Sequence, residues 1–75
     1  MEILREILTG LHPEVDFDRE RQLIDRGILD SFDIVTIVAE VDSEFAVTIP
    51  AEELTPENFN SLEALCRLVR RLEAN

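Results

Sequence analysis

Lysine, tryptophan and tyrosine are missing from this sequence of 75 residues, and cysteine, histidine and glycine are scarce. The lone cysteine, Cys66, cannot form an internal disulfide, so a reducing, cytoplasmic setting is the simplest expectation. Together with the lone histidine, His12, it makes no credible zinc site, and we expect no bound metal. Two glycines, Gly10 and Gly27, are too few for a glycine-rich phosphate loop. These scarcities argue against a catalytic centre built from the chain itself.

The short length points the same way. A domain of this size buries only roughly 60% of the surface that its unfolded chain exposes, so it cannot enclose a deep pocket and still keep a core. We therefore expect one monomeric domain over residues 1–75 that enzymes act on, rather than an enzyme. No apolar run is long enough to span a bilayer, and the N-terminus lacks the basic flank and cleavage site of a signal peptide.

Positive charge is absent from a long part of the chain. The formal net charge is −10, which argues against nucleic acid as a partner. All basic residues are arginines, and none lies between Gly27 and Cys66. The acids of that stretch are Asp30, Asp33, Glu40, Asp42, Glu44, Glu52, Glu53, Glu57 and Glu63. This acidic half could steer basic partners or could serve solubility, and composition alone favours the second interpretation.

Apolar spacing predicts a first helix over residues 2–11, whose end is marked by Gly10 and Pro13. A long first loop over residues 13–29 should follow, and its apolar side chains should pin it to the core. Those side chains are Val15, Phe17, Leu23, Ile24, Ile28 and Leu29. Gly27 suits a turn position with positive φ.

The second helix should begin at Asp30 or Ser31 and run to about Phe45. Asp30 is a good N-cap, and Asp33 adds negative charge to the first turn, where the helix dipole favours it. The β-branched residues of this segment would also suit a strand. The cap signal and the i, i+3, i+4 spacing decide for a helix.

Residues 46–50 should be extended, because a residue before proline is pushed out of the helical region. Thr55 and Pro56 predict the N-cap and first residue of a very short third helix that ends near Phe59. The last helix should start at Asn60 or Ser61, with Asn60 and Glu63 at capping-box spacing. The expected core is Leu4, Ile7, Leu8, Leu11, Ile37, Val41, Phe45, Leu62, Leu65, Leu68 and Val69.

The run from Gly27 to Asp33 contains an Asp-Ser-Phe triplet at residues 30–32. Here the sequence resembles the acyl carrier protein family, whose signature is Asp-Ser-Leu at the start of the second helix. The resemblance extends over the whole chain, from the long first loop to the acidic second helix. It implies an all-α, acyl-carrier-like bundle of three main helices and one short third helix. It also implies that Ser31 bears 4′-phosphopantetheine and that Asp30 helps the modifying enzyme.

Some positions depart from the commonest family pattern. Phe32 replaces the usual leucine, and Thr36 stands where the family has a glutamate. The Leu-Asp-Ser-Phe block looks most like the D-alanyl carrier proteins and related stand-alone carriers fed by adenylating ligases. Those carriers have glycine in place of Asp33, so the likeness to them is incomplete.

One face of the second helix is expected to meet partner enzymes. Its residues are Phe32, Asp33, Val35, Ala39 and Glu40. Phe32 could equally tuck under the first loop. The partners that the resemblance implies are a phosphopantetheinyl transferase, an adenylating acyl or aminoacyl ligase, and downstream acyl-transferring enzymes.

Two functions stay open at this point. The first is a carrier that tethers a thioester-linked acyl or aminoacyl group at Ser31 and presents it to partner enzymes. The second is an unmodified acidic helical interaction module with the same fold, in which Asp30 and Ser31 only cap a helix. Neither makes the chain a catalyst. In the first, the thiol of the prosthetic group does the covalent chemistry and separate enzymes load it, and the second is an interaction module alone.

Overall fold

Helices account for all the regular secondary structure of residues 2–74, the part of the chain that the computed structural model describes. They are α1 (Glu2–Leu11), α2 (Ser31–Phe45), a 3₁₀ turn η1 (Ala51–Glu53), α3 (Pro56–Phe59) and α4 (Leu62–Ala74). The prediction of an all-α fold with three main helices, one short third helix and a long first loop is therefore confirmed. The 3₁₀ turn was not predicted.

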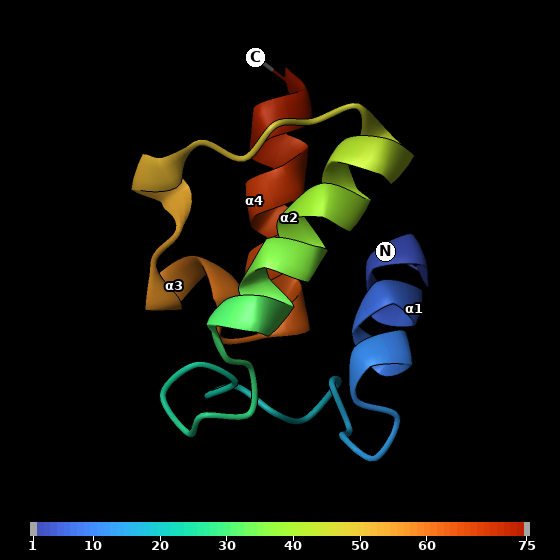
Figure 1. Ribbon diagram of the computed structural model, residues 1–75, viewed down its shortest axis with the longest axis vertical. Coiled ribbons are helices and arrows are strands. Elements are labelled where there is room, and N and C mark those ends of the chain that lie inside the picture. The colour runs from blue at the N-terminus through green and yellow to red at the C-terminus, as the bar shows by residue number, and fades with distance from the viewer. Residues whose placement is uncertain (1, 75) are drawn as a thin grey trace.

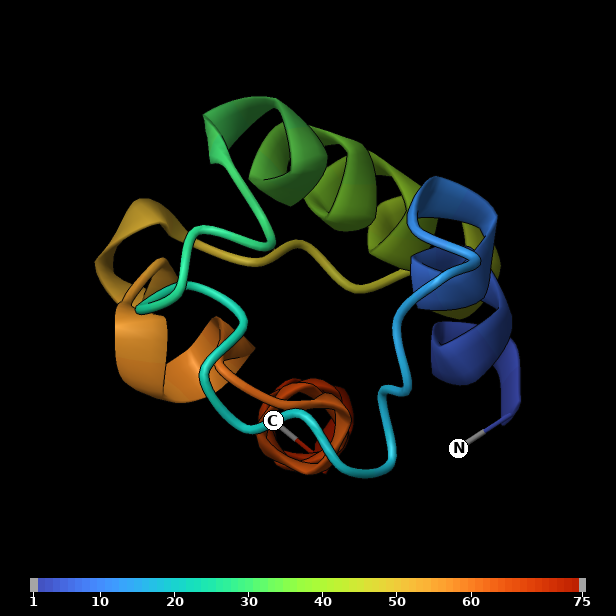
Figure 2. The same ribbon diagram turned by 90° about the horizontal axis from the view of Figure 1, so that it is seen from below.

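The helices surround one core (Figures 1 and 2). In Figure 1, α1 runs downwards at the right, whereas α2 and α4 run upwards, with α4 behind α2. Seen from below, α2, α1, α4 and α3 lie around the four sides of the bundle. The first loop crosses the lower end, so it closes the core at the end where α2 begins.

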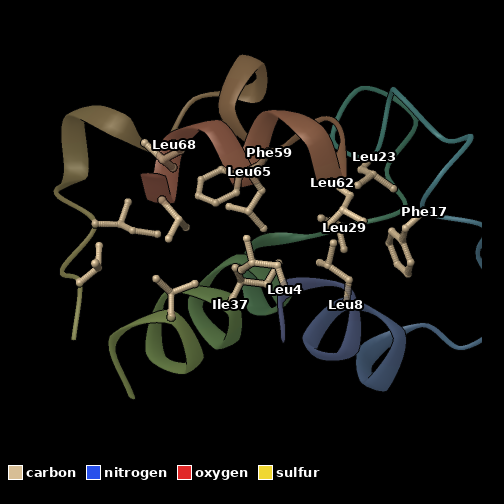
Figure 3. Packing of buried hydrophobic residues seen from close by; sticks show 14 residues of the cluster. Leu4, Leu8, Phe17, Leu23, Leu29, Ile37, Phe59, Leu62, Leu65 and Leu68 are labelled. Atoms are coloured by element: carbon tan, nitrogen blue, oxygen red, sulfur yellow. The ribbon is translucent and has the colours of Figure 1, made fainter. Parts of the chain in front are cut away.

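The core confirms most of the predicted positions. Its buried cluster is Leu4, Leu8, Phe17, Leu23, Leu29, Ile37, Val41, Val47, Ile49, Phe59, Leu62, Leu65, Leu68 and Val69. Figure 3 shows the α4 side chains facing those of α1 and α2. Phe17, Leu23 and Leu29 come from the first loop, which is thus pinned by its own side chains as expected.

Three predicted core residues, Ile7, Leu11 and Phe45, are only partly buried. Phe45 is the last residue of α2, and Ala46 follows in a left-handed conformation with φ of 55°. This left-handed residue ends the helix, and the chain that follows is extended. Along an extended chain, every second side chain points to the same face, so alternate residues point towards the core. Val47 and Ile49 are buried for that reason, and helical spacing could not identify them.

The predicted capping box of the last helix is wrong. The Asn60 side-chain oxygen instead accepts the backbone N–H groups of Ile24 and Asp25, at 2.9 and 3.1 Å. Ser61 takes over the cap, because its Oγ accepts the N–H of Ala64 at 3.0 Å. The amide of Asn60 therefore ties the first loop to the start of α4.

We predict that Phe59→Ala lowers the free energy of unfolding by about 3–5 kcal/mol, because it empties a site where the ring is only 2% exposed. Phe45→Ala removes the same ring from a partly buried helix end and should cost clearly less. Urea denaturation of the two variants measures the difference. Equal losses would contradict the placement of these two rings.

Candidate functional site

The start of α2 is fixed by a reciprocal cap. Asp30 is extended, with φ of −106° and ψ of −176°, and its carboxylate accepts the Asp33 N–H at 2.9 Å. The Asp33 carboxylate in turn accepts the Asp30 N–H at 3.3 Å. Ser31 therefore occupies the first residue of a defined helix and stays exposed.

The chain just before Ser31 is anchored in the core. Leu29 is buried, and its N–H donates to the Leu23 carbonyl at 2.9 Å. Gly27 has φ of +71°, a conformation that glycine adopts without strain, which confirms the predicted turn. The backbone that leads into Ser31 is thus anchored to the core, although the Ser31 side chain itself is exposed.

A groove of about 350 Å³ adjoins the serine, and we call it the Ser31 groove. Asp30 and Ser31 are among its lining residues. Its apolar wall is formed by Ile24, Leu29, Ile34, Leu54, Pro56 and Phe59. The groove is thus walled by the first loop, α2 and the segment around α3, and it offers apolar surface next to the hydroxyl.

His12 reaches the same helix start from the other side. Its Nε2 lies 2.8 Å from Asp33 Oδ2, and its Nδ1 lies 3.3 Å from Glu14 Oε2. The side chains of His12 and Asp33 are 26% and 13% exposed. This contact joins the end of α1 to the cap of α2. Sequence reasoning had considered His12 only as a metal ligand and missed it, since the two residues are 21 positions apart.

The contact shifts both pKa values. The hydrogen bond to Asp33 raises the pKa of His12, although burial opposes this. Burial by itself would raise the pKa of Asp33, but hydrogen bonds from His12 and the Asp30 backbone keep that pKa below its ordinary value. The pair is therefore most stable with the imidazolium and the carboxylate both charged.

The predicted partner face is exposed for most of its members. Phe32 is 77% exposed and Val35 is 67% exposed, and neither is tucked under the first loop. Ala39 and Glu40 are exposed as well. Asp33 differs, because its carboxylate is directed to the cap and to His12. Residues 2–74 contain no cluster of acids, histidine or cysteine suited to a metal.

Comparison with known proteins decides the family. Residues 1–69 match the family model described as the phosphopantetheine attachment site. The chain belongs to the acyl carrier protein family. It is a carrier that tethers acyl or aminoacyl intermediates through covalently attached 4′-phosphopantetheine, and it is not itself a catalyst. Such carriers work with a phosphopantetheinyl transferase and with further partner enzymes.

Named relatives cover most of this carrier. Aminoacyl carrier proteins 1 and 2 of Bradyrhizobium diazoefficiens are 39% and 33% identical over 69 residues, which are 92% of this chain and 76% of each relative. The D-alanyl carrier protein of Streptococcus suis is 36% identical over 42 residues, 56% of this chain and 53% of that protein. A chain in the crystal structure of an FAD-dependent dehydrogenase is 30% identical, with a TM-score of 0.70 over 96% of this carrier and 100% of that chain.

Within residues 2–74, no helix is long and apolar enough to cross a membrane. The helices that position Ser31 are short and amphipathic: α1 buries Leu4 and Leu8, and α2 buries Ile37 and Val41. Their other faces carry exposed or partly exposed residues, including those of the predicted partner face.

We predict that His12, the only histidine, titrates in NMR with a pKa above its ordinary value of about 6.5. Asp33→Asn should return that pKa towards the ordinary value, because it removes the charged partner. A wild-type pKa at or below about 6.5 would contradict the contact.

The same pair should make stability depend on pH. A raised histidine pKa stabilises the fold fully below the unfolded value of about 6.5 and loses that effect as pH rises through the folded pKa. The lowered Asp33 pKa adds stability above about pH 3.9, which is lost as pH falls through the folded pKa. The stability difference between wild type and His12→Gln should therefore be largest between about pH 4.5 and 6.5 and shrink towards pH 9. A constant difference would count against the pair.

Proposed function

We propose that Ser31 is the attachment point of 4′-phosphopantetheine. The observation that carries this is an exposed hydroxyl on the first residue of a capped helix, beside an apolar groove. The backbone N–H groups of the first turn and the positive end of the helix dipole favour an anion such as the phosphodiester. Asp30 fixes the helix start and stands next to the hydroxyl, where the transferase must work.

The other serines fit the group less well. Ser61 is buried, at 8% exposure, and its Oγ already accepts the Ala64 N–H. Ser43 is exposed, but it lies in the last turn of α2, where the negative end of the dipole disfavours a phosphodiester. Only Ser31 combines exposure, a helix start and an adjoining groove.

When bound, the prosthetic group supplies a terminal thiol that holds the cargo as a thioester. The residues of the chain position it. The cap formed by Asp30 and Asp33 fixes the start of the helix that carries Ser31. The buried side chain of Leu29 anchors the backbone just before it. The Ser31 groove offers apolar surface to the arm or to its cargo between transfers.

We propose an aminoacyl group as the cargo and an adenylating aminoacyl ligase as the loading enzyme, followed by enzymes that transfer the group onward. The aminoacyl and D-alanyl carrier names of the relatives support this. The Leu-Asp-Ser-Phe block at residues 29–32 supports it from the sequence. We also propose that residues 1–75 act as one carrier domain.

The attachment site is tested by intact mass after incubation of the apo protein with a broad-specificity phosphopantetheinyl transferase and coenzyme A. Wild type and Ser43→Ala should each gain one phosphopantetheine mass, and Ser31→Ala should gain none. Circular dichroism should show that Ser31→Ala keeps its helices, because Asp30 still caps α2. An adduct on folded Ser31→Ala would place the group on another residue and overturn the proposal.

We propose that the transferase and the ligase contact the partner face around Phe32, Val35 and Ala39. These exposed apolar residues form a small centre near Ser31, and Glu40 supplies a charge at its edge. They lie three and four residues apart and therefore adjoin on one side of α2, and contiguous exposed apolar patches mark interaction sites. Asp33 supports the partner face indirectly, because its carboxylate stabilises the start of α2 instead of contacting a partner.

Phe32→Ala should speed dissociation of the apo protein from the transferase, since exposed aromatic side chains often carry much of the binding energy of an interface. Surface plasmon resonance measures the dissociation rate. The free energy of unfolding should change by less than about 1 kcal/mol, because the ring is 77% exposed. An unchanged dissociation rate would show that this ring is not at the contact.

A further inference from the structure

A second groove, of about 530 Å³, runs between α1 and α2, and we call it the α1–α2 groove. It shares no lining residue with the Ser31 groove. Ile3, Ile7 and Leu11 line it on the α1 side, spaced four residues apart and therefore in one row along the helix. Ile3 is 40% exposed, and the other two are partly buried. The row thus leaves an apolar strip in contact with solvent.

Carboxylates rim this strip from both helices. Glu6 comes from α1, and Glu40 and Glu44 come from α2, all three exposed. Within the described residues none of the three forms an ion pair, although every arginine except Arg70 is paired with an acid elsewhere. Glu40 and Glu44 are also four residues apart on one helix, an arrangement in which like charges repel. The rim therefore lacks the positive charge that would balance it.

Gly10 keeps the groove open at the end of α1. Its φ is not positive, and a methyl group placed there would have no atom within 4 Å. Neither backbone geometry nor close packing therefore requires glycine, which is a poor helix former. A larger side chain at this position would project into the groove, so the glycine favours access to the apolar strip.

We propose that the α1–α2 groove binds a basic amphipathic helix of an enzyme that loads or unloads the carrier. The apolar row of such a helix fits the strip of Ile3, Ile7 and Leu11, and arginines or lysines on its flanks meet the three glutamates. A second copy of this chain fits poorly, because each copy has a formal net charge of −10 and two copies repel one another.

The position of the α1–α2 groove suits a site that anchors a partner enzyme. Thr36, at its near end, lies five residues after Ser31, or about 7.5 Å along α2. A helix bound there would hold the enzyme within reach of the prosthetic group and leave the serine uncovered. This proposal rests on the proposed function in one respect: the bound helix belongs to an enzyme that acts on the prosthetic group at Ser31.

The probe is a synthetic helical peptide with leucines on one face and arginines on both flanks, compared with a scrambled isomer of the same composition. Titration into ¹⁵N-labelled apo Ser31→Ala protein should shift the amides of residues 3–11 and 36–44. The scrambled isomer should bind at least tenfold more weakly. The double variant Glu40→Gln/Glu44→Gln should also lose at least tenfold in affinity, whereas Glu52→Gln/Glu57→Gln should bind as the parent does.

A second pair of variants tests the shape of the groove. Gly10→Leu should block the peptide, and Gly10→Ala should bind it, with helical circular dichroism retained in both. Equal losses in the two double glutamate variants, or shifts centred on Phe32 and Val35, would overturn the assignment. Since Ser31 is absent from the tested protein, this result and the outcome of the modification experiment are independent.

Discussion

The burial of Ile37 and Val41 fixes the rotation of α2, and the exposure of the site follows from that rotation. Both side chains are fully buried, so the opposite face of α2 must lie in solvent. Phe32 and Val35 are on that exposed face, and Ser31 stands at its first residue. The same packing that stabilises the bundle therefore exposes together the residue that we propose as the attachment point and the proposed partner face.

The buried residues fix the orientation of α2 about its axis, but they do not keep its first turn from fraying. Two further contacts do this. The reciprocal cap satisfies backbone groups at the helix start, and His12 ties Asp33 to the end of α1. On the other side, Leu29 and the Asn60 amide hold the first loop against the core and α4. The loop is long, but it is a structural part of the platform rather than a flexible tether.

Local signals in the sequence were sufficient for the α-helices and for the cap at Asp30, because apolar spacing and capping chemistry act between near neighbours. The sequence failed where distant residues meet. The contact of His12 with Asp33 and the bond from Asn60 to the first loop depend on how the helices pack, which no local pattern records. Val47 and Ile49 were missed because one left-handed residue, Ala46, changes the period of burial.

The central claim is that the prosthetic group joins a preformed platform at Ser31 without altering it. Comparing ¹H–¹⁵N spectra of the apo and phosphopantetheinylated protein tests this most directly. The account predicts shifts confined to the start of α2 and to the Ser31 groove, around Leu54 and Phe59, with the amides of α1 and α4 unchanged. Widespread shifts across α1 and α4, or none near Ser31, would contradict it.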